Sequence, residues 1–161
     1  MTTAIDDLKA RARILHRRAL ANDPAALARL GALDEPLQRR HCLAAVAKEA
    51  GFRGWSHAAA VLSGTSGDDF GELLYPRGSE AHWNVWSASY DEARDIRQQH
   101  GGYLLAYRRH FFIADEHFIA TLGLDPTDPD WETIGRDWVQ PRDAAARDRL
   151  YLKLFRARLA A

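Results

Sequence analysis

The sequence predicts an α+β protein in which about four helices precede a small three-stranded sheet flanked by helices. In the first third of the chain, apolar residues recur at helical spacing. Beyond the Ser/Gly-rich stretch 63–69, short runs of β-forming residues alternate with helix signals. We therefore expect a helical segment at 1–62, a flexible linker at 63–69 and a small α+β domain at 70–161.

The first helix begins with Thr3 and Asp6, whose spacing is that of a capping box. Its apolar residues form one narrow stripe, Ile5, Leu8, Ala12, Leu15 and Ala19. Capping residues, prolines and terminating glycines predict three shorter helices, at 23–31, 34–51 and 54–62. Helices this short are marginal alone, so we expect them to pack on one another or on the rest of the chain.

Three strands are expected after the linker, at 70–75, 83–89 and 103–114. The third has a polar middle, Arg108-Arg109-His110, where we expect the strand to bend or to face a cleft. Helix signals lie between and after these strands, at 90–100, 115–123, from 130 onward and at 143–160. We expect Asp115 and Asp130 to cap two of these helices.

Two arginines of the last helix, Arg147 and Arg158, fall inside its apolar arc when the sequence is projected at 100° per residue. An arginine in such a position extends to water or pairs with an acid. We therefore expect one or both to meet the acidic segment 125–137.

Composition excludes several classes of protein. No stretch reaches the ~18 apolar residues of a membrane helix, so no membrane is expected. The N-terminus carries no signal-peptide pattern, and a cytoplasmic location is expected. The single cysteine, Cys42, excludes an internal disulfide and a cysteine-based zinc cluster, and we expect it to be a buried thiol.

Charge is balanced over the whole chain, with 22 basic and 22 acidic residues, but not along it. Residues 1–62 carry ten basic and six acidic side chains, and the basic residues are frequent in the first helix. A nucleic-acid-binding domain usually has a pI above about 9. The pI of about 7.1 therefore argues against nucleic acid as the partner.

Three stretches carry a resemblance to known proteins: Leu8 with the basic run to Arg18, Asp23–Arg29, and Ala45–Trp55. Residues 5–62 resemble a helical segment found ahead of repeats in bacterial ankyrin-repeat proteins and in uncharacterised bacterial proteins. Gly54 stands where that segment usually has a capping serine, and no ankyrin repeat follows. The C-terminal part resembles uncharacterised bacterial proteins only, so the resemblance implies no activity.

Aromatic and basic residues near the second and third expected strands form the best candidate ligand site. A cleft here would offer arginine forks and a tryptophan face to an anionic or planar small molecule. Because neighbours on a strand alternate, only one of Trp83 and Trp86 can line it. The candidate residues are His82, Trp86, Arg108, Arg109, His110 and His117.

No metal or cofactor is expected. His110, Asp115, Glu116 and His117 are the densest metal-capable group, but the two histidines lack the i,i+4 spacing of a helical zinc site. The acids at 125–130 lack the spacing and glycine of a calcium loop.

We expect a non-catalytic protein-interaction or regulatory module, because no catalytic motif is present and the last helix has an unusually wide apolar arc. Its partner is then another protein or a second copy of the chain. One alternative is a small-molecule-binding protein or small enzyme that uses the aromatic and basic cleft. The other is a weak nucleic-acid binder that uses the basic first helix.

Overall fold

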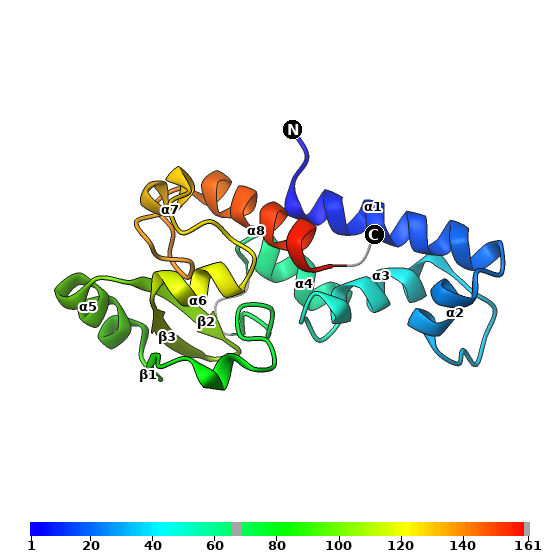
Figure 1. Cartoon of the computed structure of the whole chain (residues 1–161). Coiled ribbons are helices and arrows are strands. Elements are labelled where there is room, and N and C mark those ends of the chain that lie inside the picture. Colours follow the sequence, from blue (N-terminus) through cyan, green and yellow to red (C-terminus); the bar gives the residue numbers. More distant parts are fainter. Residues whose placement is uncertain (66–68, 160–161) are drawn as a thin grey trace.

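Helices make up the N-terminal part of the chain in the computed structural model, which describes residues 1–65 and 69–159 (Figure 1). They are α1 (Ala4–Leu20), α2 (Pro24–Leu30), α3 (Arg39–Glu49) and α4 (Trp55–Leu62). Helix α1 contacts each of the other three. No helix among the described residues is long and apolar enough to cross a membrane.

The predicted start of α1 is confirmed, and so are four of the five residues predicted for its buried stripe; Ile5 is only partly buried, and Ala4 is buried instead. The Thr3 hydroxyl accepts a hydrogen bond from the Asp6 N–H (3.2 Å), and the Asp6 carboxylate accepts one from the Thr3 N–H (3.3 Å). The buried stripe of α1 is Ala4, Leu8, Ala12, Leu15 and Ala19. Cys42 is fully buried in α3, as expected.

Helix α3 begins at Arg39, later than the predicted start at 34–36. The Glu35 carboxylate accepts hydrogen bonds from the side chains of Arg40 and His41, the latter at 3.0 Å. These contacts keep the residues before the helix out of helical conformation, and the His41 ring caps the helix by accepting the Gln38 N–H (2.9 Å). The predicted start was wrong because a proline after two acids also occurs in an extended segment that precedes a helix.

The C-terminal part is built on a three-stranded antiparallel sheet, and the α+β class is confirmed. Its strands are β1 (Val85–Ser87), β2 (Tyr103–Tyr107) and β3 (His110–Ala114) in the order β1-β3-β2. The predicted strand 103–114 is a hairpin, since the chain turns at Arg108-Arg109, where Arg108 has φ +54°. The predicted strand 70–75 was wrong.

Residues 70–75 pass through a turn instead. Gly71 has φ +75°, which ends any extended run, and the Tyr75 N–H bonds the Glu72 carbonyl (3.1 Å). Phe70, Leu73 and Leu74 are nevertheless buried. The apolar pattern thus predicted burial correctly and the backbone conformation wrongly, because a short apolar run does not determine whether the segment is a strand, a helix or a turn.

Helices cover both faces of the sheet. Besides the one-turn 3-10 helix η1 (Ser79–Ala81), they are α5 (Tyr90–His100), α6 (Glu116–Thr121), α7 (Pro129–Thr133) and α8 (Ala144–Arg158). Ala93 of α5 forms a small apolar cluster with Leu104 and Ile113 on one face of the sheet. Leu105 and Phe112, on the other face, belong to the main core.

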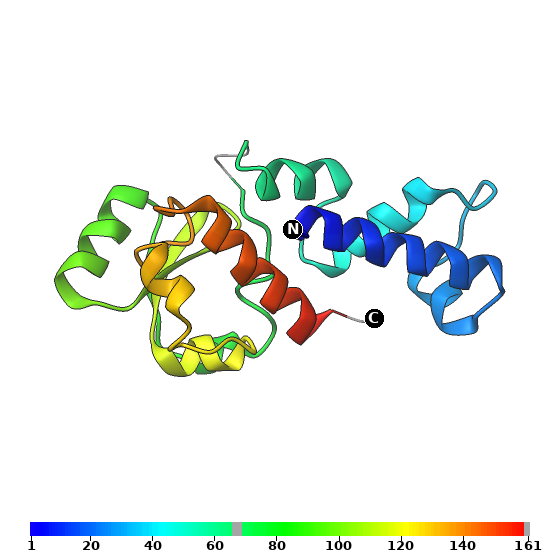
Figure 2. The ribbon, with the colours of Figure 1, turned by 90° about the horizontal axis from the view of Figure 1, so that it is seen from above.

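The main core is continuous through both parts of the chain, from Ala4 to Phe155. Helix α8 contacts α7 and also α1, and Figure 2 shows it running beside the sheet toward the N-terminal helices. The Asp148 carboxylate of α8 accepts a hydrogen bond from the Ala4 N–H (2.9 Å). The expected linker, 63–69, includes residues 66–68, which lie outside the described residues; the division into domains stays a prediction.

The partners of Arg147 and Arg158 in α8 differ from those predicted. Arg147 donates to the Trp138 carbonyl (2.9 Å), and Arg158 to the Leu73 carbonyl (2.6 Å). Neither meets an acid at 125–137; each guanidinium group donates to a backbone carbonyl instead. The acids of that segment pair with Arg149 and Lys153 of the same helix instead, through Asp128 and Asp130.

Two predicted helix caps had different outcomes. The Asp115 carboxylate accepts the Phe118 N–H (2.8 Å), which confirms it as the cap of α6. Helix α7 is capped by Asp128, which accepts the Asp130 N–H (3.0 Å), and not by Asp130.

Candidate functional site

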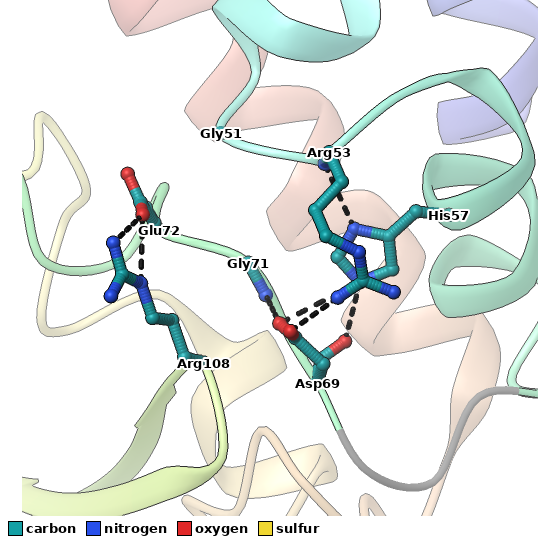
Figure 3. Close-up of a pocket in the computed structure, with 7 residues that line it drawn as sticks. All are labelled: Gly51, Arg53, His57, Asp69, Gly71, Glu72 and Arg108. Atoms are coloured by element: carbon teal, nitrogen blue, oxygen red, sulfur yellow. Dashed lines mark hydrogen bonds and ion pairs between the residues drawn. The ribbon is translucent and has the colours of Figure 1, made fainter.

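A pocket of about 310 Å³, lined by several charged residues, lies where the two parts of the chain meet (Figure 3). Its walls come from the turn between α3 and α4, from α4, from the segment after the linker and from the β2–β3 turn. The lining residues are Gly51, Arg53, His57, Asp69, Gly71, Glu72 and Arg108. We call this the joint pocket.

Two glycines let the backbone segments of the joint pocket approach closely. The Glu72 N–H donates to the Gly51 carbonyl (2.9 Å). A Cβ on Gly71 would lie 2.7 Å from the Gly51 oxygen, and a Cβ on Gly51 would lie 2.7 Å from the Leu73 nitrogen. Both glycines also have positive φ, which side chains other than glycine adopt at a cost.

The same segment is also bonded to the sheet. The Phe70 N–H donates to the Arg108 carbonyl (2.9 Å), and the Arg108 N–H donates to the Gly71 carbonyl (2.8 Å). Residues 70–72 are therefore held on one side by the N-terminal helices and on the other by the β2–β3 turn.

His57 connects the two sides of the joint pocket and is buried. Its Nδ1 accepts the Arg53 N–H (3.0 Å), while its Nε2 lies 2.8 Å from the Asp69 carbonyl oxygen and donates to it. This arrangement selects the neutral ring with the proton on Nε2. Both ring nitrogens are occupied, so His57 has no lone pair left for a general base.

The charged groups of the joint pocket are matched in pairs. The Asp69 carboxylate accepts a hydrogen bond from the Gly71 N–H (2.9 Å) and forms an ion pair with Arg53. Arg108 donates from Nε to Glu72 (2.8 Å), and this hydrogen bond raises the pKa of the Arg108 guanidinium. The pocket is thus a hydrogen-bonded joint that holds the segment, with its cations already engaged.

Two of the sequence-predicted site residues, Trp86 and Arg108, contact Tyr107. Trp86 stacks on Phe112, with ring centroids 4.7 Å apart, and also borders Tyr107 (6.3 Å). The Arg108 guanidinium lies over the Tyr107 ring, 5.2 Å from its centroid. The Arg108 guanidinium turns toward Glu72, and its Nε and Nη2 both donate to the Glu72 carboxylate.

The predicted histidines are spread over the domain. His82 is half-buried against Phe118, with ring centroids 5.4 Å apart. His110 begins β3 and His117 lies in α6, beyond the end of that strand, so a strand length of about 13 Å separates them. Arg109, His110 and His117 are exposed. Within residues 1–65 and 69–159, no group of three or more metal-capable side chains converges.

Sequence reasoning missed His57, Asp69 and Glu72, because their partners lie 12 to 36 positions away in the chain. It also missed Tyr75, whose ring contacts Trp86, Tyr107 and Phe112 at centroid distances of 5.0 to 5.5 Å. The glycine after Asp69 and Phe70 was the available signal, since an isolated glycine in a strand pattern indicates a bend or a close backbone approach.

Exposed apolar side chains lie along β1 and just before it, with Val85 and Trp86 on opposite faces of the sheet, and we call Trp83, Val85 and Trp86 the edge patch. Trp83 is 94% exposed, Val85 44% and Trp86 42%. Strand β1 pairs with β3 on one side, and no other described strand pairs with its outer side. The edge patch thus combines apolar side chains with an unpaired strand backbone.

Comparison of the chain with protein-family models, with curated proteins and with solved structures gives no match.

Proposed function

We propose that the chain is a non-catalytic protein-interaction module that binds an extended segment of a partner protein along β1. The observation that carries this proposal is the exposure of Trp83 (94%) beside an open strand edge. Tryptophan is enriched among the residues that dominate binding energy at protein interfaces. An open edge binds an extended segment through main-chain hydrogen bonds, and the neighbouring side chains select its sequence.

Charge around β1 indicates the chemistry of that segment. The first turns of α5 carry Asp91, Glu92 and Asp95, against Arg94 alone. Ser87 of β1 donates to the Glu92 carboxylate (2.6 Å), which places this acidic turn next to the strand. We therefore infer a segment with apolar residues for the edge patch and at least one lysine or arginine for α5.

The same acids argue for a foreign segment over a second copy of the chain. Antiparallel pairing of β1 with its own copy would bring two acidic α5 turns to the same face of a joined sheet. Like charges brought together in this way oppose association. A basic extended segment meets no such repulsion.

The test uses a displayed library of random peptides, selected on the purified protein. We expect selected peptides to alternate apolar residues and to carry a basic residue. The Trp83→Ala variant is expected to bind them at least about 30-fold more weakly, as for an interface hot spot. Leu20→Ala is the matched control, because Leu20 is also exposed (64%) but lies on α1.

Three results would overturn the proposal. Two of them are equal peptide affinity for the wild type, Trp83→Ala and Leu20→Ala, and no enrichment of peptides at all. The other is a dimer in sedimentation experiments that Trp83→Ala abolishes, since this would make a second copy the occupant. Because Trp83 makes little contact with the fold, its replacement leaves the free energy of unfolding within about 0.5 kcal/mol of the wild type.

A further inference from the structure

A second pocket, separate from the joint pocket and the edge patch, gathers arginines from three segments of the chain. It measures about 340 Å³ and is lined by Arg97, Glu132, Gly135, Arg136 and Arg142. Arg97 lies in the last turn of α5, Arg136 follows α7, and Arg142 precedes α8. We call it the arginine pocket.

The cations of the arginine pocket exceed its acids. Arg136 pairs with Glu132, with Nε 2.7 Å from Oε1. Neither Arg97 nor Arg142 meets a carboxylate at ion-pair distance in the part of the chain that the structure describes. The pocket is therefore two positive charges in excess, in contrast to the joint pocket, where each arginine has an acid.

The backbone holds Arg136 in an unfavourable conformation that tertiary bonds impose. Arg136 has φ +51°, which is uncommon for a residue other than glycine. Its N–H donates to the Trp131 carbonyl (2.7 Å), and its carbonyl accepts the Leu104 N–H of β2 (2.9 Å). Its guanidinium lies over the ring of Tyr103, 4.8 Å from the centroid. The side chain is thus fixed before any ligand arrives.

Arg142 is placed by the absence of a side chain at Gly135. A Cβ on Gly135 would lie 2.9 Å from Arg142 Nε and 3.3 Å from its Cζ. The arginine therefore lies across the glycine, and its N–H donates to the Ile134 carbonyl (3.3 Å). Arg142 is thus held against the turn that carries Arg136.

We propose that the arginine pocket binds the dianionic phosphate group of a small phosphomonoester. Guanidinium groups match phosphate oxygens through paired hydrogen bonds, and a dianion balances the two excess charges. At about 340 Å³, the pocket is larger than inorganic phosphate fills. The remaining space accommodates an organic group, and the polar walls favour one that carries hydroxyls.

The test measures binding of glycerol 3-phosphate and of inorganic phosphate by two-dimensional NMR, at constant ionic strength set with sodium chloride. We expect saturable shifts of the Gly135 amide in the wild type, with glycerol 3-phosphate bound more tightly. Arg142→Gln and Arg97→Gln each remove one charge-assisted contact, and we expect dissociation constants at least about tenfold weaker. Arg13→Gln is the control, because Arg13 is exposed on α1, away from α5 and α7 in Figure 1.

Thermal unfolding without phosphate checks that the variants fold, and the direction of the change in the unfolding midpoint is a second prediction. Removing one of several like charges relieves repulsion, so Arg97→Gln is expected to unfold at the same or a higher temperature than the wild type at low salt. Added glycerol 3-phosphate is expected to raise the midpoint of the wild type more than that of the variant. Equal affinities in wild type and Arg142→Gln, or shifts that sodium chloride alone reproduces, would overturn the proposal. Tighter binding of inorganic phosphate than of glycerol 3-phosphate would overturn the assignment to a phosphomonoester.

Discussion

Replacing Gly71 with alanine tests whether the joint pocket holds the two parts of the chain together. Two costs combine at this position. A residue with a side chain at φ +75° costs about 1–2 kcal/mol. The added methyl group would also lie 2.7 Å from the Gly51 oxygen and 3.1 Å from the Phe52 ring, so the backbone has to move.

The second cost can be estimated from its closest contact. The atom that the methyl group meets is a backbone oxygen, which accepts the Glu72 N–H at 2.9 Å and cannot turn aside as a flexible side chain does. Overpacking of this kind costs about 1–3 kcal/mol. We therefore expect Gly71→Ala to lower the free energy of unfolding by about 3 kcal/mol.

Gly78→Ala is the matched control for the conformational cost alone. Gly78 has φ +90°, but a Cβ there would meet nothing within 4 Å. The expected loss is about 1–2 kcal/mol, so the difference between the two variants measures the close approach. Urea denaturation followed by circular dichroism, with linear extrapolation, gives both values. Equal losses in the two variants would refute the argument that the contact between Gly51 and Gly71 is essential.

Three further predictions concern titrating groups. Hydrogen bonds from Arg149 lower the pKa of Asp130, so its ionised form contributes stability above pH 4 that is lost as the pH falls through the folded-state pKa. In urea denaturation at several pH values, Asp130→Asn should lower the free energy of unfolding by about 1 kcal/mol at pH 7 and leave it unchanged at low pH. A loss that does not depend on pH would contradict this. Burial raises the pKa of Asp148, so ionisation of this carboxyl lowers stability as the pH rises through its folded-state pKa. Asp148→Asn keeps an oxygen that accepts the Ala4 N–H, and the thermal unfolding midpoint of this variant at pH 7 should equal or exceed that of the wild type. Burial also raises the pKa of the Cys42 thiol, and labelling by an aromatic disulfide at pH 8 should wait for unfolding, whereas immediate labelling would contradict its burial.

The elements that the sequence predicted well are those with signals inside a few residues. The capping box of Thr3 and Asp6 lies within one helical turn of its own helix, and the buried stripe of α1 repeats at the period of that helix. Asp115 caps α6 through a residue three positions away. Such signals need no knowledge of the rest of the chain.

The elements predicted wrongly depend on contacts made far along the chain. The run 70–75 is apolar enough for a strand, but Gly51 and Arg108 hold its backbone in a turn. The run 103–114 has β-forming residues on both sides of Arg108-Arg109-His110, and the positive φ of Arg108 divides it into two strands. The polar middle predicted a bend or a cleft there, but arginine is an unusual residue at positive φ, so residue type did not indicate a tight turn.

The candidate site was predicted in part for the same reason. The sequence pointed to Trp86 and Arg108, and both contact Tyr107. It could not show that Glu72, 36 positions earlier, occupies the arginine. Grouping residues by nearness along the chain also placed His110 and His117 together, although the strand between them carries them apart.

The polar clusters of the molecule fall into two kinds, and the distinction separates stability from binding. In the joint pocket each arginine meets an acid and the buried histidine uses both ring nitrogens, so nothing there is left for a ligand. In the arginine pocket the charges do not balance, and on the edge patch apolar surface stays in water. We therefore expect the arginine pocket and the edge patch, rather than the joint pocket, to be where the protein binds. Substitutions at Gly71 should therefore act on folding, whereas those at Trp83 and Arg142 should act on what the protein binds.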